Sequence, residues 1–417
     1  MEQIVELHPH SKYARACSPQ LTLDNIDRTC AEKGVTVMGT GDFTHPAWFS
    51  AMQKTLEPAE SGLYRVRGSK AGTRFLCTSE IACIWSQGGK VRRLHIVVTA
   101  PSLEAVAKIN ANLAKIGNLA ADGRPILGMS AKHLAQVVWE VDPSCLVIPA
   151  HAWTPWFSIF GSFSGFDSIP ECFEELAKNI YAIETGLSSD PPMNWRVSAL
   201  DSVLLLSNSD AHSLPNIARE ANRFFIPVDK LSYIELHRII KEKDRTGFRG
   251  TIEFYPEEGM YHYDGHRACG VAMPPEETKR RGGKCPKCGK PVTVGVLNRV
   301  EQLADRPEGT RPPGAFDFVK LVELDKIIAE AMGVKSRQSK RVQQAFSELL
   351  SKGGTELNIL LKLEKKELAA IAAPEVVEGI LRVREGRLKI TPGYDGQYGT
   401  VHIFSPDKIK VRQPSLF

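Results

Sequence analysis

The sequence predicts an α/β fold, followed by a small metal-binding segment and a mainly helical C-terminal region. Short apolar segments alternate with helical patterns up to about residue 255, a cluster of cysteines and histidines follows, and glycine-punctuated helical patterns fill the rest. Alternation of strands and helices over such a length favours one α/β barrel or a doubly wound parallel sheet. We therefore expect three domains, at residues 1–255, 256–300 and 301–417.

The expected strands of the first domain are short and almost continuously apolar, as buried parallel strands are. They cover Ile4–Leu7, Val35–Met38, Phe75–Ser79, Arg93–Thr99, Leu146–Pro149, Tyr181–Glu184 and Val203–Ser207. Helical patterns at Leu23–Lys33, Ser102–Lys115, Ala131–Trp139 and Cys172–Lys178 separate several of them.

The C-terminal region is expected to hold short helices, with stops at Gly333, Gly353–Gly354 and Gly386, because glycine readily adopts the left-handed conformation that ends a helix. They cover Phe316–Met332, Ser339–Lys352, Glu356–Leu363, Lys366–Ala373 and Pro374–Glu385. The glycine-rich stretch Thr391–Thr400 predicts a final hairpin.

Composition places the chain in the cytoplasm and excludes a membrane protein. Of the 417 residues, 42% are hydrophobic, enough for at least one core, yet the longest apolar runs have only strand length. The N-terminus has no signal pattern, and most of the nine cysteines are scattered through apolar segments, which fits a reducing compartment.

The net charge of +5 is concentrated near the C-terminus. From Ala331 to Phe417 there are 15 lysines and arginines against nine acidic residues. Such asymmetry is typical of a module that binds a polyanion, and a solvated helical face would explain it as well. If the region binds DNA, we expect contacts to phosphates that do not depend on base sequence.

Metal-ligand residue types recur where the expected strands end. His8 and His10 share one face because residues two apart in a strand point the same way. Side chains at the carboxyl ends of parallel strands converge on one edge, where imidazoles and carboxylates suit Zn²⁺, Mn²⁺ or Fe²⁺. The alternative for each single residue is an ordinary hydrogen-bonded polar side chain. The further candidates are Asp42, His45, Glu80, His95, His151, Glu184, Asp210 and His212.

These residues carry a resemblance to a known family. The strings HPHS, GTGD, LHIVV, PAHAW and NSDAH, together with Glu80, follow the order and spacing of the PHP family of metal-dependent phosphoesterases. The strings IETGLSSDPPMNWR and YHYDGHRACG and the segment Asn208–Asn222 are similar to one branch of that family, endonuclease Q. The resemblance implies a distorted (β/α)7 barrel and a DNA backbone cut 5′ to deaminated bases (hypoxanthine, uracil, xanthine) or abasic sites.

The resemblance also implies ligand sets for two to three divalent ions, which could be Zn²⁺, Mn²⁺, Mg²⁺ or Fe²⁺. His8, His10, Glu80 and Asp210 would hold the first ion, and Glu80 would bridge it to a second ion held by His95 and His151. The segment Lys12–Cys17, which follows His10, contains no histidine or acidic residue that could be a further ligand. The remaining candidates for a third ion are therefore His212 with Asp42 or His45. We expect His8, His10, Glu80 and Asp210 to be catalytic, since ions held there would activate water and neutralise the phosphate.

The segment Cys285–Lys290, Cys-Pro-Lys-Cys-Gly-Lys, has the spacing of a zinc site. Two residues between the cysteines let both thiolates reach one ion. We expect His266 and Cys269 to complete a Cys₃His site that holds one structural zinc, with His262 as the alternative histidine. A redox-active cysteine pair is the competing interpretation, although no thioredoxin-like βαβ pattern surrounds it.

The segment His151–Ser168 combines two tryptophans and four phenylalanines with glycine and serine, directly after a predicted metal ligand. Aromatic walls suit a base that has left the DNA stack, and they suit equally well hydrophobic anchors beneath a long loop. The candidate substrate contacts are Trp153, Trp156 and Phe157, followed by Asn194, Trp195, Arg196 and Arg219.

Three functions remain open from the sequence: a repair endonuclease acting on damaged DNA, a phosphatase for a small phosphate ester, and a non-catalytic DNA-binding accessory. The metal-binding segment and the basic helical region favour the endonuclease, because a phosphatase needs neither. We expect a monomer, and Gln413–Phe417 resembles a sequence that binds a sliding clamp.

Overall fold

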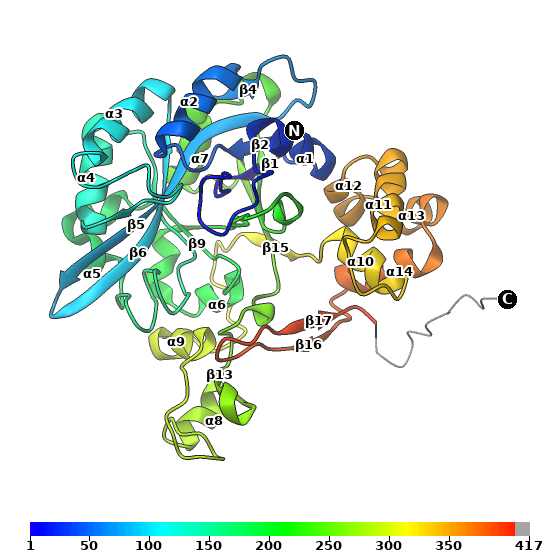
Figure 1. Ribbon diagram of the computed structural model, residues 1–417. Helices are drawn as coiled ribbons and strands as arrows, with labels where there is room; N and C mark the ends of the chain where they lie inside the picture. Colours follow the sequence, from blue (N-terminus) through cyan, green and yellow to red (C-terminus); the bar gives the residue numbers. More distant parts are fainter. Residues whose placement is uncertain (405–417) are drawn as a thin grey trace.

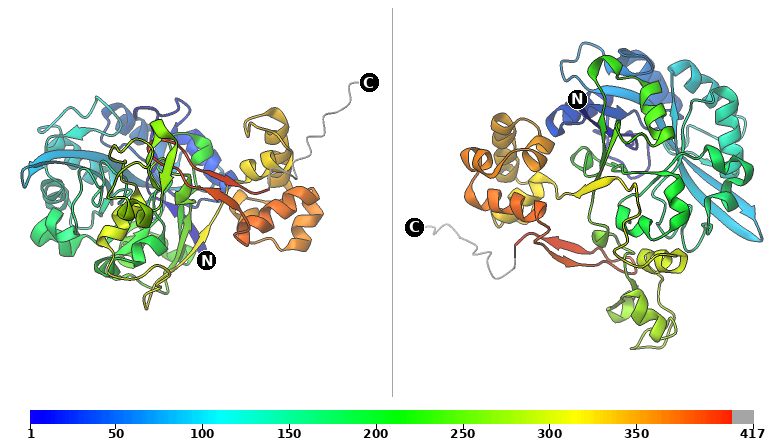
Figure 2. Two further views of the ribbon diagram at one scale, coloured as in Figure 1. Left: turned by 90° about the horizontal axis from the view of Figure 1, so that it is seen from below. Right: turned by 180° about the vertical axis from the view of Figure 1, so that it is seen from behind.

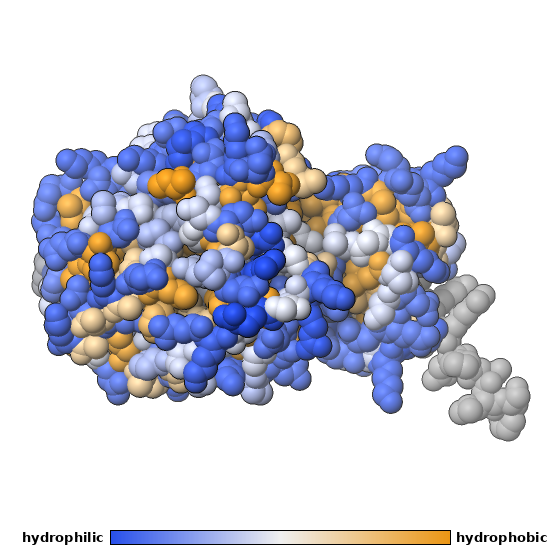
Figure 3. Space-filling model, turned by 90° about the horizontal axis from the view of Figure 1, so that it is seen from above, coloured by the Kyte–Doolittle hydropathy of each residue, from blue (hydrophilic) through white to orange (hydrophobic). Residues whose placement is uncertain are grey.

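The computed structural model describes residues 1–404. They form a large α/β body, a small segment around β13 and α8 beneath it, and a helical body at its side (Figure 1). Views from below and from behind show the helical body attached along one edge of the α/β body (Figure 2). Seen from above, the surface is mostly hydrophilic, and the molecule is narrower between these two bodies than across either of them (Figure 3).

The central sheet is mixed, with strand order β15-β12-β11-β1-β2-β5-β4-β3. β1 pairs in parallel with β2, and β2 with β5, whereas β11 runs antiparallel to both β1 and β12. β9 and β10 form a separate parallel pair. The strands are β1 (Glu2–Glu6), β2 (Val37–Gly39), β3 (Leu56–Pro58), β4 (Tyr64–Val66), β5 (Arg74–Gln87), β6 (Lys90–Ala100), β7 (Ile126–Leu127), β8 (Val147–Pro149), β9 (Ala182–Glu184), β10 (Leu204–Leu206), β11 (Ala221–Phe225) and β12 (Phe248–Glu253).

Helices cover the outside of the sheet, and several begin at a side-chain cap. Thr22 and Ser130 accept backbone N–H groups at the starts of α1 and α4, which satisfies donors that a helix leaves free. The helices of this body are α1 (Leu23–Lys33), α2 (Pro46–Thr55), α3 (Leu103–Leu113), α4 (Ala131–Val141), α5 (Ile169–Phe173), α6 (Pro191–Trp195) and α7 (Tyr233–Glu242).

The predicted α/β architecture is confirmed as a mixed α/β fold. The prediction that all its strands are parallel is wrong for one of them. The expected strand Arg93–Thr99 belongs to β6, which runs antiparallel to β5 and to β8. Gly88 and Gly89 both have positive φ, so the chain turns back tightly after β5 and forms a hairpin instead of a helical crossover. The barrel count of seven strand–helix units stays a prediction.

The segment between residues 256 and 300 is built from short elements. A two-stranded pair, β13 (Asp264–His266) and β14 (Val271–Met273), is joined by the single turn η6 (Arg267–Cys269). α8 (Pro275–Arg280) and α9 (Val296–Leu303) flank the cysteine loop. The apolar cluster of this segment contains only Val271, Met273, Cys285 and Val292, with Cys269 at its edge.

The helical region contains α10 (Leu324–Ala331), α11 (Lys340–Gly353), α12 (Glu356–Leu361), α13 (Lys365–Ile371) and α14 (Pro374–Arg384), and the predicted glycine stops lie at the ends of α10, α11 and α14. The prediction of a helix over Phe316–Met332 is wrong for the first half of that range. There, β15 (Asp317–Lys320) pairs in parallel with β12, so residues beyond the expected boundary at 301 still join the central sheet. The predicted final hairpin is confirmed as β16 (Lys389–Thr391) and β17 (Thr400–His402).

A buried ion pair anchors the helical region to the α/β body. Lys33 of α1 donates from Nζ to Oε2 of Glu356 at 2.8 Å, and the other Glu356 oxygen accepts the Leu324 N–H at 2.9 Å. Arg337 donates to Asn216 across the same interface and to Glu323 within the helical region. Arg384 donates to three backbone carbonyls of its own region. These two arginines therefore hold the structure together and are not free basic residues. No helix among residues 1–404 is long and apolar enough to cross a membrane.

Candidate metal centres

Four predicted ligands meet at one end of the α/β body. One ligand atom from each of His8, His10, Glu80 and Asp210 lies within 4.8 Å of the other three. The segments after β1 and β10 run side by side here through a Pro9–Ala211 bridge, so each places its ligands next to those of the other. His10 Nε2 lies 3.0 Å from Asp210 Oδ1 and 3.3 Å from Glu80 Oε2.

Glu80 joins this group to a second one, made with His95 and His151. Its Oε1 lies 2.7 Å from His95 Nδ1 and 3.1 Å from His151 Nε2, while its Oε2 faces His8 and His10. One oxygen toward each group is what a carboxylate needs to bridge two ions. We call the six residues together the histidine–carboxylate centre. Glu80 lies inside β5, not at its end as expected, because the strand continues to Gln87.

The ligand atoms behave as metal ligands would. His8 Nε2, His10 Nε2 and Asp210 Oδ1 are buried, and none has a hydrogen-bond partner among the described residues. Although these atoms lie close to one another, their contacts lack hydrogen-bond geometry. Buried polar atoms are almost always satisfied, so a cluster of unsatisfied ones fits a divalent ion held by imidazole and carboxylate.

The far side of three of the four imidazoles is held by a hydrogen bond. His8 Nδ1 lies 3.0 Å from Glu184 Oε2, His10 Nδ1 lies 2.9 Å from Asp42 Oδ1, and His151 Nδ1 lies 3.0 Å from Ser158 Oγ. When Nδ1 donates and the ring is neutral, Nε2 of each of these rings offers a lone pair to an ion. Glu184 was recognised in the sequence only as a carboxylate at a strand end. Its pairing with a ring 176 residues away is visible only after folding.

An amide network ties Glu184 to the surrounding strand ends. Asn208 donates to Glu184 Oε1 at 2.7 Å and accepts the Leu7 N–H at 2.8 Å, while Asn222 donates to Asn208 Oδ1 at 3.0 Å. The His151 N–H donates to Glu184 Oε2 at 3.0 Å. The carboxylate that orients His8 is therefore itself fixed from several strands.

The backbone is strained at three positions of the centre. Asp42, His151 and Asp210 have φ of 45°, 28° and 46°, in the left-handed region that residues with a Cβ seldom adopt. Such conformations persist only where the surrounding structure imposes them, and they cluster at functional sites. At these positions the backbone directs the ligands His151 and Asp210 toward the centre. It also directs the Asp42 carboxylate onto the ring of a third ligand, His10.

Charge keeps the centre in its ligating form. Burial opposes ionisation of Glu80, but the fixed positive charge of Arg124 beside it favours the carboxylate, and the pKa of Glu80 lies well below its usual range. Burial likewise opposes ionisation of Asp210, but the close approach of His10 Nε2 to its Oδ1, at 3.0 Å, favours the carboxylate, and the pKa of Asp210 lies well below its usual range. Burial lowers the pKa of His95 to about 4, which leaves that ring neutral.

The residues expected at a third ion do not form a ligand group with one another among the described residues. Both oxygens of Asp42 are engaged, one with His10 and the other with the Ser11 N–H at 2.6 Å. His45 stacks on Tyr13 at 4.4 Å, and His212 packs edge-on against His10 with Nδ1 2.8 Å from the Asp210 carbonyl oxygen. Asp42 is placed to orient His10, and a third ion remains a prediction.

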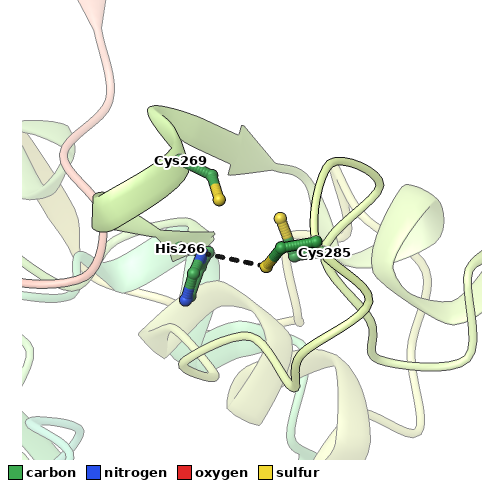
Figure 4. Close-up of side chains that lie close together, drawn as sticks. His266, Cys269 and Cys285 are labelled. Atoms are coloured by element: carbon green, nitrogen blue, oxygen red, sulfur yellow. Dashed lines mark hydrogen bonds between the residues drawn. The ribbon is translucent and has the colours of Figure 1, made fainter.

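The Cys₃His group forms as the spacing predicts. His266, Cys269, Cys285 and Cys288 offer ligand atoms within 4.8 Å of one another, and His266 Nδ1 lies 3.6 Å from Cys288 Sγ. Figure 4 shows His266 and Cys269, from the β13–η6 turn, facing the loop that carries Cys285. Burial opposes ionisation of Cys285, but backbone N–H groups of Lys287 and Cys288 lower the pKa of that thiol. Tetrahedral zinc suits this donor set. The alternative ligand His262 is buried outside the group.

The aromatic segment divides into a buried and an exposed part. Trp153 is buried and donates from Nε1 to Asn194 Oδ1 at 2.8 Å, so both are part of the core. Phe157 packs on His95 at 4.5 Å. Trp156 is 37% exposed and stacks on Phe163, itself 54% exposed, with ring centres 4.7 Å apart and planes 3° from parallel.

The other predicted substrate contacts are occupied by protein. Arg196 is buried and paired with Glu301, and Trp195 packs against Phe318. Arg219 donates twice to the Ser209 carbonyl oxygen, at 2.9 and 3.1 Å, and so supports the backbone just before Asp210. Among the predicted substrate contacts, Trp156 is the one with an exposed ring.

One charged residue of the centre was not recognised in the sequence. Arg124 donates from Nη1 to Glu80 Oε2 at 3.0 Å and is 23% exposed. The arginine lies in a loop between α3 and β7 with no motif around it, and only the folded chain brings it to Glu80.

Comparison with known sequences gives two relatives. The MJ0043 C-terminal domain family matches residues 323–387. The chain is 35% identical to the MJ0043 protein of Methanocaldococcus jannaschii over 268 residues, which are 62% of this chain and 32% of that protein, so the chain spans about a third of the length of that relative. It is 29% identical to YqxK of Bacillus subtilis over 390 residues, covering 91% of this chain and 92% of YqxK.

Comparison with solved structures extends over the whole chain. The lesion-specific endonuclease PfuEndoQ from Pyrococcus furiosus matches with a TM-score of 0.84 at 29% identity, covering 96% of this chain and 95% of that one. Endonuclease Q in complex with a 27-mer duplex substrate, with an abasic lesion at the active site, matches with a TM-score of 0.85 at 29% identity and full coverage of both chains. The chain has the endonuclease Q fold.

This match confirms the resemblance inferred from the strings IETGLSSDPPMNWR and YHYDGHRACG. It also agrees with the mixed α/β architecture, the Cys₃His group and the helical C-terminal region. The clamp-like sequence Gln413–Phe417 lies outside the described residues.

Proposed function

We propose that this chain is a metal-dependent DNA endonuclease that hydrolyses the phosphodiester 5′ to deaminated bases or abasic sites. The observation that carries the proposal is the full-length likeness to endonuclease Q bound to a duplex with an abasic lesion. The histidine–carboxylate centre supports it, because its ligand types and its shared Glu80 suit hydrolysis of a phosphate ester. In this scheme residues 1–255 are the catalytic domain, 256–300 a structural zinc segment and 301–417 a DNA-binding domain.

The chain supplies the scaffold for this chemistry. His8, His10, Glu80 and Asp210 would hold one divalent ion, and Glu80, His95 and His151 a second. When bound, such ions act as Lewis acids that lower the pKa of water and offset charge on the phosphate. Glu184 and Asp42 keep the rings of His8 and His10 aimed inward, so little reorganisation is needed when a substrate arrives.

The helical region offers basic residues for the DNA backbone. Lys335, Lys340, Arg341, Lys365 and Lys366 are exposed and form no ion pair among the described residues. Exposed cations of this kind bind phosphates without reading sequence, and the binding weakens as salt rises. Arg337 and Arg384 are excluded from this role, since their donors are used within the protein.

The exposed stack of Trp156 and Phe163 is the surface that we assign to lesion recognition. The segment that carries it contacts the centre, because the His95 N–H donates to the Phe157 carbonyl oxygen. Stacking of a base on an aromatic ring contributes about 1–3 kcal/mol. Trp156→Ala should therefore reduce the preference for inosine-containing over undamaged duplex by about 5-fold or more. Phe225→Ala, which removes an exposed ring on β11, is the matched control. Unchanged selectivity in Trp156→Ala would remove the stack from the recognition surface.

The proposal is tested with end-labelled duplexes carrying inosine, uracil, an abasic site or no lesion, incubated with Mg²⁺ or Mn²⁺. We expect a nick on the 5′ side of each lesion and an intact undamaged strand. Release of phosphate from small monoesters without nicking would indicate a phosphatase. Tight DNA binding without either activity would indicate a non-catalytic accessory. Titration with a chelator should abolish nicking, and added metal should restore it.

A further inference from the structure

The guanidinium of Arg124 lies beside the carboxylate that the two ligand groups share. Its Nη1 donates to Glu80 Oε2 at 3.0 Å, on the side of Glu80 that faces His8 and His10. The side chain is 23% exposed, so it reaches the centre and solvent together. Arginine keeps its positive charge at any physiological pH, so this is a fixed cation at the edge of the centre.

The loop that carries Arg124 is tied down on both sides. The Arg124 N–H donates to Asp122 Oδ1 at 3.0 Å, and the next carbonyl, of Pro125, accepts the Ala82 N–H of β5 at 2.9 Å. On the other side the Gly123 N–H donates to the Tyr13 carbonyl at 3.0 Å. The position of the guanidinium is thus set by backbone contacts and does not depend on Glu80 alone.

Glycine is required next to this arginine. A Cβ at Gly123 would lie 2.7 Å from Asp42 Cγ and 2.8 Å from the Ala14 nitrogen, closer than real Cβ atoms come. The loop therefore packs directly against the carboxylate that orients His10. Arg124 lies on the same side of the centre as Asp42, where the sequence led us to expect a third ion.

Most of the hydrogen-bonding capacity of Arg124 is unused. A guanidinium has five N–H donors, and among the described residues the Arg124 side chain donates only one hydrogen bond, to Glu80. The planar fork of donors matches two oxygens of a phosphate, and such charge-assisted pairs are stronger than neutral ones. A partly exposed arginine with free donors, held beside metal ligands, has the features of a phosphate-binding residue.

We propose that Arg124 is a catalytic residue that binds a non-bridging oxygen of the scissile phosphate through the donors it does not share with Glu80. This inference rests on the proposed function, because it assigns the phosphate contact of the same reaction. As water attacks phosphorus and the bond to the leaving oxygen breaks, negative charge grows on the non-bridging oxygens. A cation already in place stabilises that charge without reorganisation.

The test compares Arg124→Met and Arg124→Lys with Arg74→Met. Arg74 is an apt control because it lies on β5 like Glu80, is paired with Glu60 and is 24% exposed, but it touches no ligand of the centre. Three quantities are measured for each: bound metal by mass spectrometry, inhibition of nicking by inorganic phosphate, and single-turnover nicking of abasic duplex at saturating protein. A calorimetric phosphate titration of the metal-loaded protein accompanies them.

We expect Arg124→Met to keep the wild-type metal content and to lose about 10²–10³-fold in single-turnover rate, as removal of one oxyanion donor does. Phosphate affinity should fall at least about 10-fold, corresponding to one lost charge-assisted contact. Arg124→Lys should recover part of the rate, since it restores the charge but not the fork. Arg74→Met should match wild type in all measurements.

Two results would overturn the inference. Loss of metal in parallel with rate in Arg124→Met would show that Arg124 only supports Glu80. Unchanged phosphate affinity with normal metal content would show that it does not contact the phosphate. Absence of nicking by the wild-type protein would refute the proposed function instead, and the calorimetric titration would still decide whether Arg124 binds phosphate.

Discussion

The two ligand clusters of this chain are built in opposite ways. The histidine–carboxylate centre draws its six residues from segments spread between His8 and Asp210, which lie in or follow strands far apart in the sequence. The Cys₃His group draws its four residues from two short turns between His266 and Cys288. The first can exist only after the whole α/β body has folded, whereas the second is local.

The supports around the clusters differ as well. The imidazoles of the centre are oriented by buried carboxylates and hydroxyls, so the ligand geometry is set before any ion arrives. Apart from the ligand Cys285, the Cys₃His group has three buried apolar residues beneath it, too few to stabilise a fold. We infer that metal binding at the Cys₃His group provides folding energy, as in small zinc domains, whereas the preformed centre uses its ions for chemistry.

The largest effect on nicking is expected from Asp210→Asn. The change keeps the size of the side chain but removes the negative charge of a ligand that is 26% exposed, where substrate can reach it. The nicking rate should fall by at least about 10³-fold, while affinity for abasic duplex stays near that of wild type. Single-turnover nicking and a gel-shift titration measure the two quantities. A wild-type rate in Asp210→Asn would mean that the reaction occurs elsewhere.

A smaller loss is expected from Glu184→Gln. The amide keeps a hydrogen bond to His8 but no longer offsets the charge of the ring, and changes of this type cost about 10–100-fold in metal affinity or activity. Raising the metal concentration should restore part of the nicking rate. Gln3→Glu, which alters a buried amide at the opposite end of β1, controls for general damage to the core. Nicking that is insensitive to Glu184→Gln would contradict preorganisation of the centre.

The smallest effect on nicking is expected from the double change Cys285→Ser and Cys288→Ser. The protein should lose one zinc per chain, and residues 256–300 should become sensitive to protease, because two of the four ligands are gone. At low temperature the nicking rate should fall less than in either variant of the centre. Zinc content equal to that of wild type would disprove the assignment, and a rate as low as that of Asp210→Asn would show that the group has a direct part in catalysis.

The sequence was informative wherever function imposes a residue type at a fixed spacing. His8 with His10, and Cys285 with Cys288, lie so close in the chain that a strand or a turn alone brings them together. The capped helix Leu23–Lys33 was also predicted to the residue, since Thr22 before it and Gly34 after it mark its ends.

The sequence was uninformative where a role depends on contacts between distant segments. Asp42 has the residue type of a ligand, but folding turns its carboxylate onto the back of His10. Arg124 has no motif around it, and Glu184 is marked only as a carboxylate at a strand end, because the partners that define their roles lie 44 and 176 residues away. The strand β15 was mistaken for helix because its four residues gain strand structure only by pairing with β12.

The β16–β17 hairpin has a consequence for the architecture as a whole. From the end of the helical region it reaches back to the zinc segment, where Asp395 accepts the Arg267 N–H and the Thr293 hydroxyl, both at 2.6 Å. The Gly393 N–H also donates to the Glu257 carbonyl at 2.8 Å. The hairpin works as a tether that makes the two appendages one mechanical unit. A truncation before Lys389 would thus remove the packing beside His266 and Cys269. A change near the C-terminus would therefore weaken a metal site more than 100 positions earlier in the chain.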